Sequence, residues 1–195
     1  MKFSAVVRCI PNTLTMIRFV GVIVATWYLF QKTDAGTYTA FFLYAGIGLS
    51  DFLDGYLARR LNAVTAFGKL MDPIADKAYV LTLYASFVFL GTISHWWLWP
   101  IFIREISVTV SRLLLVRQGK VVAAEKSGKI KTAVQNVSLL LLAIYYVNVS
   151  FWHYKHVGWI SVLPVVMYLF LSAAVLLTIT SGIDYYTKNK EAIWS

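Results

Sequence analysis

Four aspartates in one short stretch of the chain have the spacing of a metal site. Asp51 and Asp54 are three residues apart, and Asp72 and Asp76 are four apart, so on helices each pair would lie on one face. The stretch holds no histidine or cysteine, and a set of carboxylates alone suits a hard cation such as Mg²⁺ or Mn²⁺. Four carboxylates can hold two such ions, so the pattern predicts a site for two divalent cations.

Small residues and an arginine accompany these aspartates. Gly55 and Gly68 each destabilise a helix by about 1 kcal/mol relative to alanine. The absence of a side chain at these positions allows a ligand or a neighbouring helix to approach the backbone closely. Ala58 is also small, and Arg59 provides a fixed cation suited to phosphate. Together with the carboxylates, these residues favour a diphosphate held by two metals. Taken singly, the small residues suit helix–helix packing, and Arg59 suits an anchor at a membrane surface. A structural network of salt bridges is the alternative for the whole set.

The elements that must position these residues are long apolar helices. Hydrophobic residues make up 59% of the chain and charged residues 14%, against about 25% charged in a typical soluble domain. A membrane-spanning helix needs roughly 20 mostly apolar residues, and the apolar runs here are continuous, without the alternation that a β-barrel requires. We predict six helices, at about residues 12–30, 38–59, 67–90, 95–116, 131–149 and 157–186.

The cost of burying charge indicates that the aspartates face a polar space. One carboxylate at the centre of a membrane helix costs roughly 3 kcal/mol, so four would cost about 12 kcal/mol without cations, water or metal around them. The sequence therefore predicts an all-α integral membrane protein. We expect one domain over residues 1–195, with six transmembrane helices around a cytoplasm-facing, polar, metal-binding cavity.

The distribution of lysine and arginine predicts the orientation in the membrane. With six spans, both termini and the second and fourth loops share one side, and that side collects most of the cations outside the spans, whereas the opposite loops hold only Lys32 and Lys155. Because cytoplasmic loops are enriched in Lys and Arg, both termini and the metal site are expected on the cytoplasmic side of a cell's inner (plasma) membrane. The same bias accounts for the net charge of +9, so a nucleic-acid partner is not expected.

The motif resembles that of a known family. It reads Asp51-x-x-Asp54-Gly55-x-x-Ala58-Arg59, followed after eight residues by Gly68-x-x-x-Asp72-x-x-x-Asp76. Every fixed position of the motif of the CDP-alcohol phosphotransferases is filled at the right spacing. The resemblance implies a membrane enzyme with six helices that is usually a homodimer. Such an enzyme uses divalent metal to move a phosphatidyl group from a CDP-linked lipid to an alcohol, and it releases CMP.

The resemblance also implies a role for each motif residue. Asp51, Asp54 and Asp72 would be metal ligands, and Asp76 would contact a metal and act as the general base that accepts the proton of the alcohol. The residues that would contact the CDP moiety are Asp51, Gly55, Ala58, Arg59 and Gly68. Further stretches, at residues 11–19, 103–112 and 119–132, resemble the branch of the family that uses glycerol 3-phosphate. The implied reaction converts CDP-diacylglycerol and glycerol 3-phosphate to phosphatidylglycerophosphate and CMP.

The phosphate of glycerol 3-phosphate needs cations of its own. Arg104 and Arg112 are eight residues apart and share a helix face, while Lys129 and Lys131 are expected to open the following helix. We predict that these four residues bind the acceptor phosphate, although the two lysines are equally well explained as interfacial anchors. Asn12 is predicted to contact the CDP moiety from the first helix, and its alternative role is to cap that helix.

Two alternatives to this function stay open. The first is the same reaction class with another acceptor, namely inositol phosphate, serine or phosphatidylglycerol. The second is a divalent-cation transporter with acidic residues inside the membrane. Transporters more often have broken helices and internal repeats, and a transporter gives no reason for the Gly-Ala-Arg spacing.

Overall fold

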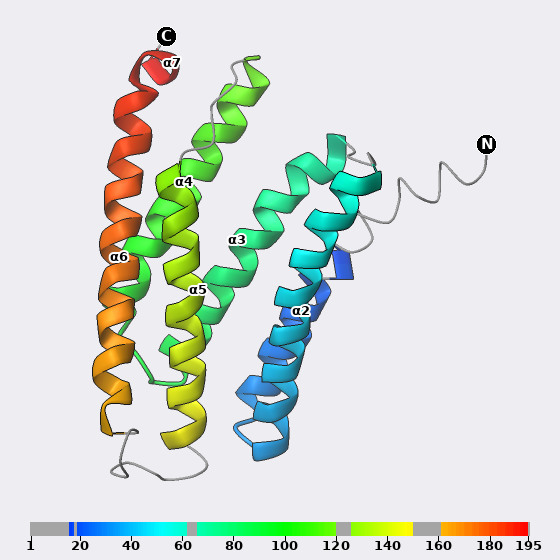
Figure 1. Cartoon of the computed structure of the whole chain (residues 1–195), viewed down its shortest axis with the longest axis vertical. Coiled ribbons are helices and arrows are strands. Elements are labelled where there is room, and N and C mark those ends of the chain that lie inside the picture. The colour runs from blue at the N-terminus through cyan, green and yellow to red at the C-terminus, as the bar shows by residue number, and fades with distance from the viewer. Residues whose placement is uncertain (1–15, 18, 62–65, 120–125, 150–160, 195) are drawn as a thin grey trace, which may run out of the picture. The chain divides into compact units, whose positions relative to one another are not determined.

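The computed structural model describes residues 16–17, 19–61, 66–119, 126–149 and 161–194, and every regular element in these ranges is a helix (Figure 1). Asn12 lies outside the described residues. The helices are Phe19–Phe30, α2 (Asp34–Leu61), α3 (Ala66–Phe89), α4 (His95–Arg117), α5 (Lys126–Val147), α6 (Leu163–Lys188) and α7 (Lys190–Trp194). The all-helical fold is therefore confirmed.

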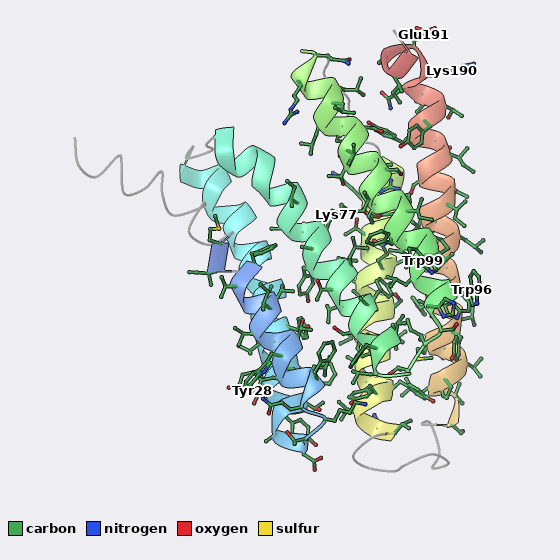
Figure 2. The ribbon with its side chains drawn as sticks, turned by 180° about the vertical axis from the view of Figure 1, so that it is seen from behind. Tyr28, Lys77, Trp96, Trp99, Lys190 and Glu191 are labelled. Atoms are coloured by element: carbon green, nitrogen blue, oxygen red, sulfur yellow. The ribbon has the colours of Figure 1, made fainter. Side chains whose placement is uncertain are left out.

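Two of the described helices are long and apolar enough to cross a membrane, Gly128–Val147 and Leu163–Lys188. The second of these is apolar on its exposed side as well as on its buried side. Val165, Leu169 and Leu176 are each more than 60% exposed, whereas a surface helix of a soluble protein would carry polar residues there. Trp96 and Trp99 lie exposed near the start of α4 (Figure 2), as expected of aromatic residues at a membrane interface. Six membrane crossings stay a prediction.

Three helices begin several residues away from their predicted positions, and the first of these is α2, which begins at Asp34 rather than at residue 38. The fifth helix begins at Lys126 rather than at residue 131, because its first turn is polar and precedes the apolar run that the prediction followed. Lys129 and Lys131 therefore lie inside α5 instead of opening it. The sixth helix begins at Leu163, with Pro164 in its first turn, where the N–H that proline lacks is not needed. Residues 161–162, which were predicted to belong to this helix, form a short turn before it.

The chain forms two compact units, Met1–Ser86 and Phe87–Ser195. In the first unit, the helix Phe19–Phe30 packs on α2 through hydroxyl groups, since Thr26 Oγ1 lies 2.7 Å from the hydroxyl of Tyr44. The hydroxyl of Tyr79 on α3 donates a hydrogen bond of 3.2 Å to the carbonyl of Tyr44. Tyr44 is 4% exposed, so one buried tyrosine joins three helices. The single-domain prediction stays a prediction.

In the second unit, α6 packs against both α4 and α5 (Figure 1). Apolar side chains from the three helices, among them Ile101, Leu142 and Met167, are fully buried. Polar side chains are buried in the same unit. Gln135 of α5, for example, donates a hydrogen bond of 3.1 Å to Thr178 of α6. The core of this unit is therefore mostly apolar but includes buried polar side chains. One of these is Lys131, which was predicted to bind the acceptor.

Gly36 provides a test of the junction between the first helix and α2. A Cβ at this position would lie 2.7 Å from the carbonyl oxygen of Tyr28, a backbone atom that cannot rotate away (Tyr28 is labelled in Figure 2). Gly36→Ala is therefore expected to lower the free energy of unfolding by about 1–3 kcal/mol. The matched control is Gly46→Ala in the same helix, where no atom lies within 4 Å of the new Cβ. The control should be neutral or stabilising by up to about 1 kcal/mol. Thermal unfolding of both variants in detergent compares them, and equal stability would contradict the packing described here.

Candidate active site

The motif residues lie on two helices, as predicted. α2 carries Asp51, Asp54, Gly55, Ala58 and Arg59, and α3 carries Gly68, Asp72 and Asp76. Because both stretches are helical, the spacing of three and of four residues places each pair of aspartates on one helix face. The structure describes the backbone of these residues, but of their side chains it describes only that of Asp76, which is half-buried. Among the described side chains, no group of three or more His, Cys, Asp or Glu residues gathers as a metal site. The other three aspartates lie outside that set.

The contact between α2 and α3 sets the level at which the two pairs of aspartates meet. A Cβ at Gly48 would lie 3.5 Å from the Tyr79 hydroxyl, and the rings of Tyr44 and Tyr79 have their centroids 6.1 Å apart. Asp51 follows Gly48 by three residues, and Asp76 precedes Tyr79 by three. Only residues 62–65 connect the two helices, and so short a connection joins antiparallel neighbours. Asp51 and Asp76 each lie about one helical turn closer to this connection than Gly48 and Tyr79 do. Their backbone positions are therefore at the same height along the two helices.

Two of the four predicted acceptor cations meet at one carboxylate. Glu105 of α4 accepts a hydrogen bond of 3.2 Å from Nη1 of Arg104, and the same oxygen, Oε1, pairs with Nζ of Lys131 on α5. Glu105 and Lys131 are each 1% exposed, and the side chain of Arg104 is 13% exposed. The Arg104 side chain also lies against α6, where a Cβ at Gly182 would be 3.0 Å from its Cγ. Residues of three helices thus fix these cations.

The other two predicted cations lie differently. Arg112 is exposed, and its guanidinium carbon lies 5.7 Å from the centroid of the Tyr185 ring on α6. Arg112 of α4 therefore lies against the part of α6 that begins at Gly182. Arg104 contacts the same part of α6. Lys129 is exposed, whereas Lys131 two residues later is buried, so the two lysines are on different faces of α5. The structure brings Arg104 and Lys131 together and leaves Lys129 apart from that pair.

Sequence reasoning missed Glu105 and Tyr185. A signal for Glu105 was present, because it is a carboxylate inside an apolar run, and the cost argument that drew attention to the four aspartates applies to it as well. No comparable signal marked Tyr185, one of many tyrosines in an aromatic-rich chain. Its 1% exposure and its place beside Arg112 follow from packing alone.

The first unit has two helices with paired aspartates, and the second unit has a buried pair of cations. Both features are typical of a membrane enzyme that acts on phosphate groups. The sequence matches the CDP-alcohol phosphatidyltransferase family over residues 8–180, and the chain belongs to that family. The family is membrane-bound and generally uses divalent metal ions. The donor set of the chain fits such an ion, because the backbone positions of the four motif aspartates form two pairs, each on one face of a helix, and carboxylates are preferred ligands of such ions.

Relatives of the chain are enzymes of phospholipid synthesis. It is 37% identical to a CDP-diacylglycerol–glycerol-3-phosphate 3-phosphatidyltransferase of Bacillus subtilis over 74% of this chain and 69% of the relative. It is 34% identical to a probable phosphatidylglycerophosphate synthase of Mycobacterium tuberculosis over 92% of this chain and 80% of the relative. A CMP-forming cardiolipin synthase of Streptomyces coelicolor is also 34% identical, but over only 58% of this chain and 54% of the relative.

Proposed function

We propose that this protein transfers the phosphatidyl group of CDP-diacylglycerol to glycerol 3-phosphate and forms phosphatidylglycerophosphate and CMP. The observation that carries this proposal is the match, over 92% of the chain, to a relative named for this reaction. The match to the family extends over residues 8–180 and so includes α4 and α5, which carry the predicted acceptor cations. Family membership also favours a transferase over the transporter alternative.

Asp51, Asp54, Asp72 and Asp76 would hold two divalent ions, Mg²⁺ or Mn²⁺. When bound, the ions would offset the charge of the diphosphate and of the departing CMP. The α2–α3 contact supports this assignment, because it brings position 51 to the level of position 76. The residues proposed to contact the CDP moiety are Asn12, Asp51, Gly55, Ala58, Arg59 and Gly68. Of these, Arg59 offers the fixed charge for phosphate, and the small residues leave room for the nucleotide.

Asp76 is the proposed general base. The hydroxyl of glycerol 3-phosphate is a poor nucleophile at neutral pH, and a carboxylate near it can accept its proton as the new bond to phosphorus forms. The half-buried position of Asp76 suits this role, since partial burial limits competition from water. The same residue would also contact a metal ion.

The membrane arrangement belongs to the same proposal. The chain would cross a cell's inner (plasma) membrane six times as a homodimer, with both termini and the active site on the cytoplasmic side. The two long apolar helices and the exposed apolar side of α6 support membrane insertion. The cytoplasmic side is also where water-soluble glycerol 3-phosphate would enter the site.

Arg104, Arg112, Lys129 and Lys131 are proposed to bind the phosphate of the acceptor. Arg104→Ala or Arg112→Ala would remove a charge-assisted contact worth roughly 1.5–3 kcal/mol. The KM for glycerol 3-phosphate should therefore rise about 10- to 150-fold, because about 1.4 kcal/mol corresponds to tenfold. The KM for CDP-diacylglycerol should change much less, since other residues hold its diphosphate. Steady-state kinetics with each substrate varied in turn measures both constants.

The matched control for these variants is Arg117→Ala, an exposed arginine in the last turn of the same helix. It should leave both constants near those of the unaltered protein. Equal weakening toward both substrates in the Arg104 or Arg112 variants would mean that these arginines support the fold or the nucleotide site instead.

Purified protein given CDP-diacylglycerol and one acceptor at a time tests the acceptor assignment. CMP release should be fastest with glycerol 3-phosphate and much slower with serine, inositol phosphate or phosphatidylglycerol. Faster release with phosphatidylglycerol would favour the cardiolipin-forming reaction for which the S. coelicolor relative is named. A protein that releases no CMP with any acceptor would refute the proposed transfer.

A further inference from the structure

Glu105 is the most deeply buried carboxylate among the described residues, and no role was predicted for it from the sequence. Its side chain has no exposed surface, and its Oε1 pairs with Lys131 of α5 and with Arg104 of its own helix. Both partners are cations that the sequence singled out for the acceptor phosphate. The carboxylate therefore fixes the positions of two proposed substrate contacts at once.

Stability alone does not explain this ion pair. Taking a carboxylate and an ammonium out of water is costly, and replacing such a buried pair by apolar side chains is often neutral or stabilising. The same unit also buries apolar side chains, among them Leu139 and Leu142 of α5 and Leu171 of α6. A pair kept in such a core is consistent with a role in binding.

The face of α5 that carries Lys131 is held against α6 by hydrogen bonds between buried side chains. Gln135, one turn further along α5, is 1% exposed and donates a hydrogen bond of 3.1 Å to Thr178 of α6. Thr178 in turn donates to the carbonyl of Ala174, at 2.6 Å. The buried polar face of α5 is thus fixed against α6, and Gly182 of α6 lets the stem of Arg104 lie close by. Glu105 connects this α5–α6 pair to α4.

We propose that Glu105 is a positioning residue that orients Lys131 and Arg104 toward the phosphate of the acceptor substrate. This inference rests on the proposed function, because it takes the acceptor to be a phosphorylated alcohol. Glu105 itself contacts neither substrate and acts through the two cations. Its removal should therefore weaken acceptor binding even though both cations are still present.

Three variants separate this role from a structural one: Glu105→Gln, Lys131→Met and the double variant. Each single variant leaves one buried charge without its main partner and should lower the melting temperature by about 6–20 °C. The double variant removes the two fully buried charges, leaves only the partly exposed Arg104, and should recover much of that loss. The KM for glycerol 3-phosphate should rise about tenfold in Glu105→Gln and about 10- to 150-fold in Lys131→Met. In the double variant it should be at least as high as in Lys131→Met despite the recovered stability, because Arg104 also loses its carboxylate partner.

The matched controls are Glu191→Gln and Lys190→Met, which make the same chemical changes at exposed positions of α7 (Figure 2). Neither should change the melting temperature or either KM. A normal KM for glycerol 3-phosphate in Glu105→Gln or in the double variant would overturn the proposal and make the pair purely structural. An equal rise of the KM for CDP-diacylglycerol would overturn it too.

A phosphate-binding measurement distinguishes failure of this inference from failure of the proposed function. If the unaltered protein releases no CMP with glycerol 3-phosphate, the proposed function fails, and inorganic phosphate becomes the probe. Phosphate should then raise the melting temperature of the unaltered protein and have little effect on the double variant. An equal effect on both proteins, or none on either, would overturn the role of Glu105.

Discussion

Removal of divalent metal with EDTA is expected to abolish CMP release, and addition of Mg²⁺ or Mn²⁺ is expected to restore it. The physical reason is charge. A diphosphate placed beside four carboxylates would be repelled unless cations lie between them, and the motif supplies one arginine against four aspartates. CMP release measured across a titration of free metal concentration gives the dependence directly.

Two aspartate variants show whether the motif is the source of this metal requirement. Asp54→Asn should shift the titration to higher metal concentration, because a carboxylate is a better ligand for a hard cation than an amide. Asp184→Asn changes an exposed aspartate of α6 outside the motif and should leave the titration unchanged. Full turnover in a metal-free preparation would contradict the two-metal site.

Asp76→Asn is expected to lower turnover by at least about 10²-fold, the lower end of the contribution of a general base. The substitution keeps the volume of the side chain and removes the group that would accept the proton of the acceptor hydroxyl. Binding of CDP-diacylglycerol should be largely retained, with some loss because Asp76 would also contact a metal. Single-turnover CMP release and a separate binding measurement distinguish the two effects. Near-normal turnover in this variant cannot be reconciled with Asp76 as the base.

The helices of the chain could be predicted from the sequence, because long apolar runs mark them directly. The predicted helix at 95–116 differs from α4 by one residue. The errors occurred where a helix extends beyond its apolar run, as at Lys126, or where a proline fixes its beginning, as at Leu163. Apolar content locates the part of a helix suited to a membrane, and the polar ends need other signals.

The level at which helices contact one another could not be predicted in the same way. The spacing of Asp51 and Asp54 predicts that they share a face, but not which residue of α3 lies opposite. That relation depends on Tyr79 packing beside Gly48 and bonding to the carbonyl of Tyr44, a choice among many aromatic residues that only the packed structure makes.

The group of Arg104, Lys131 and Glu105 shows a second limit of prediction from the sequence. Arg104 and Lys131 were selected from the sequence as cations suited to phosphate, and the structure brings them together. The element that joins them, Glu105, went unnoticed because the sequence argument looked for charges complementary to a phosphate. A buried cation often needs a carboxylate to hold it, so a lone acidic residue in an apolar run is a candidate for that role.

The most direct test of the proposed transfer is identification of the lipid product, because CMP release alone does not distinguish transfer from hydrolysis. Purified protein, CDP-diacylglycerol, glycerol 3-phosphate and Mg²⁺ would be incubated, and the lipids analysed by mass spectrometry alongside CMP. The proposal predicts one phosphatidylglycerophosphate for each CMP, and a rate in Asp76→Asn lowered to the same extent for both products. Formation of CMP with phosphatidic acid, or with no phosphatidylglycerophosphate, would contradict the proposed function.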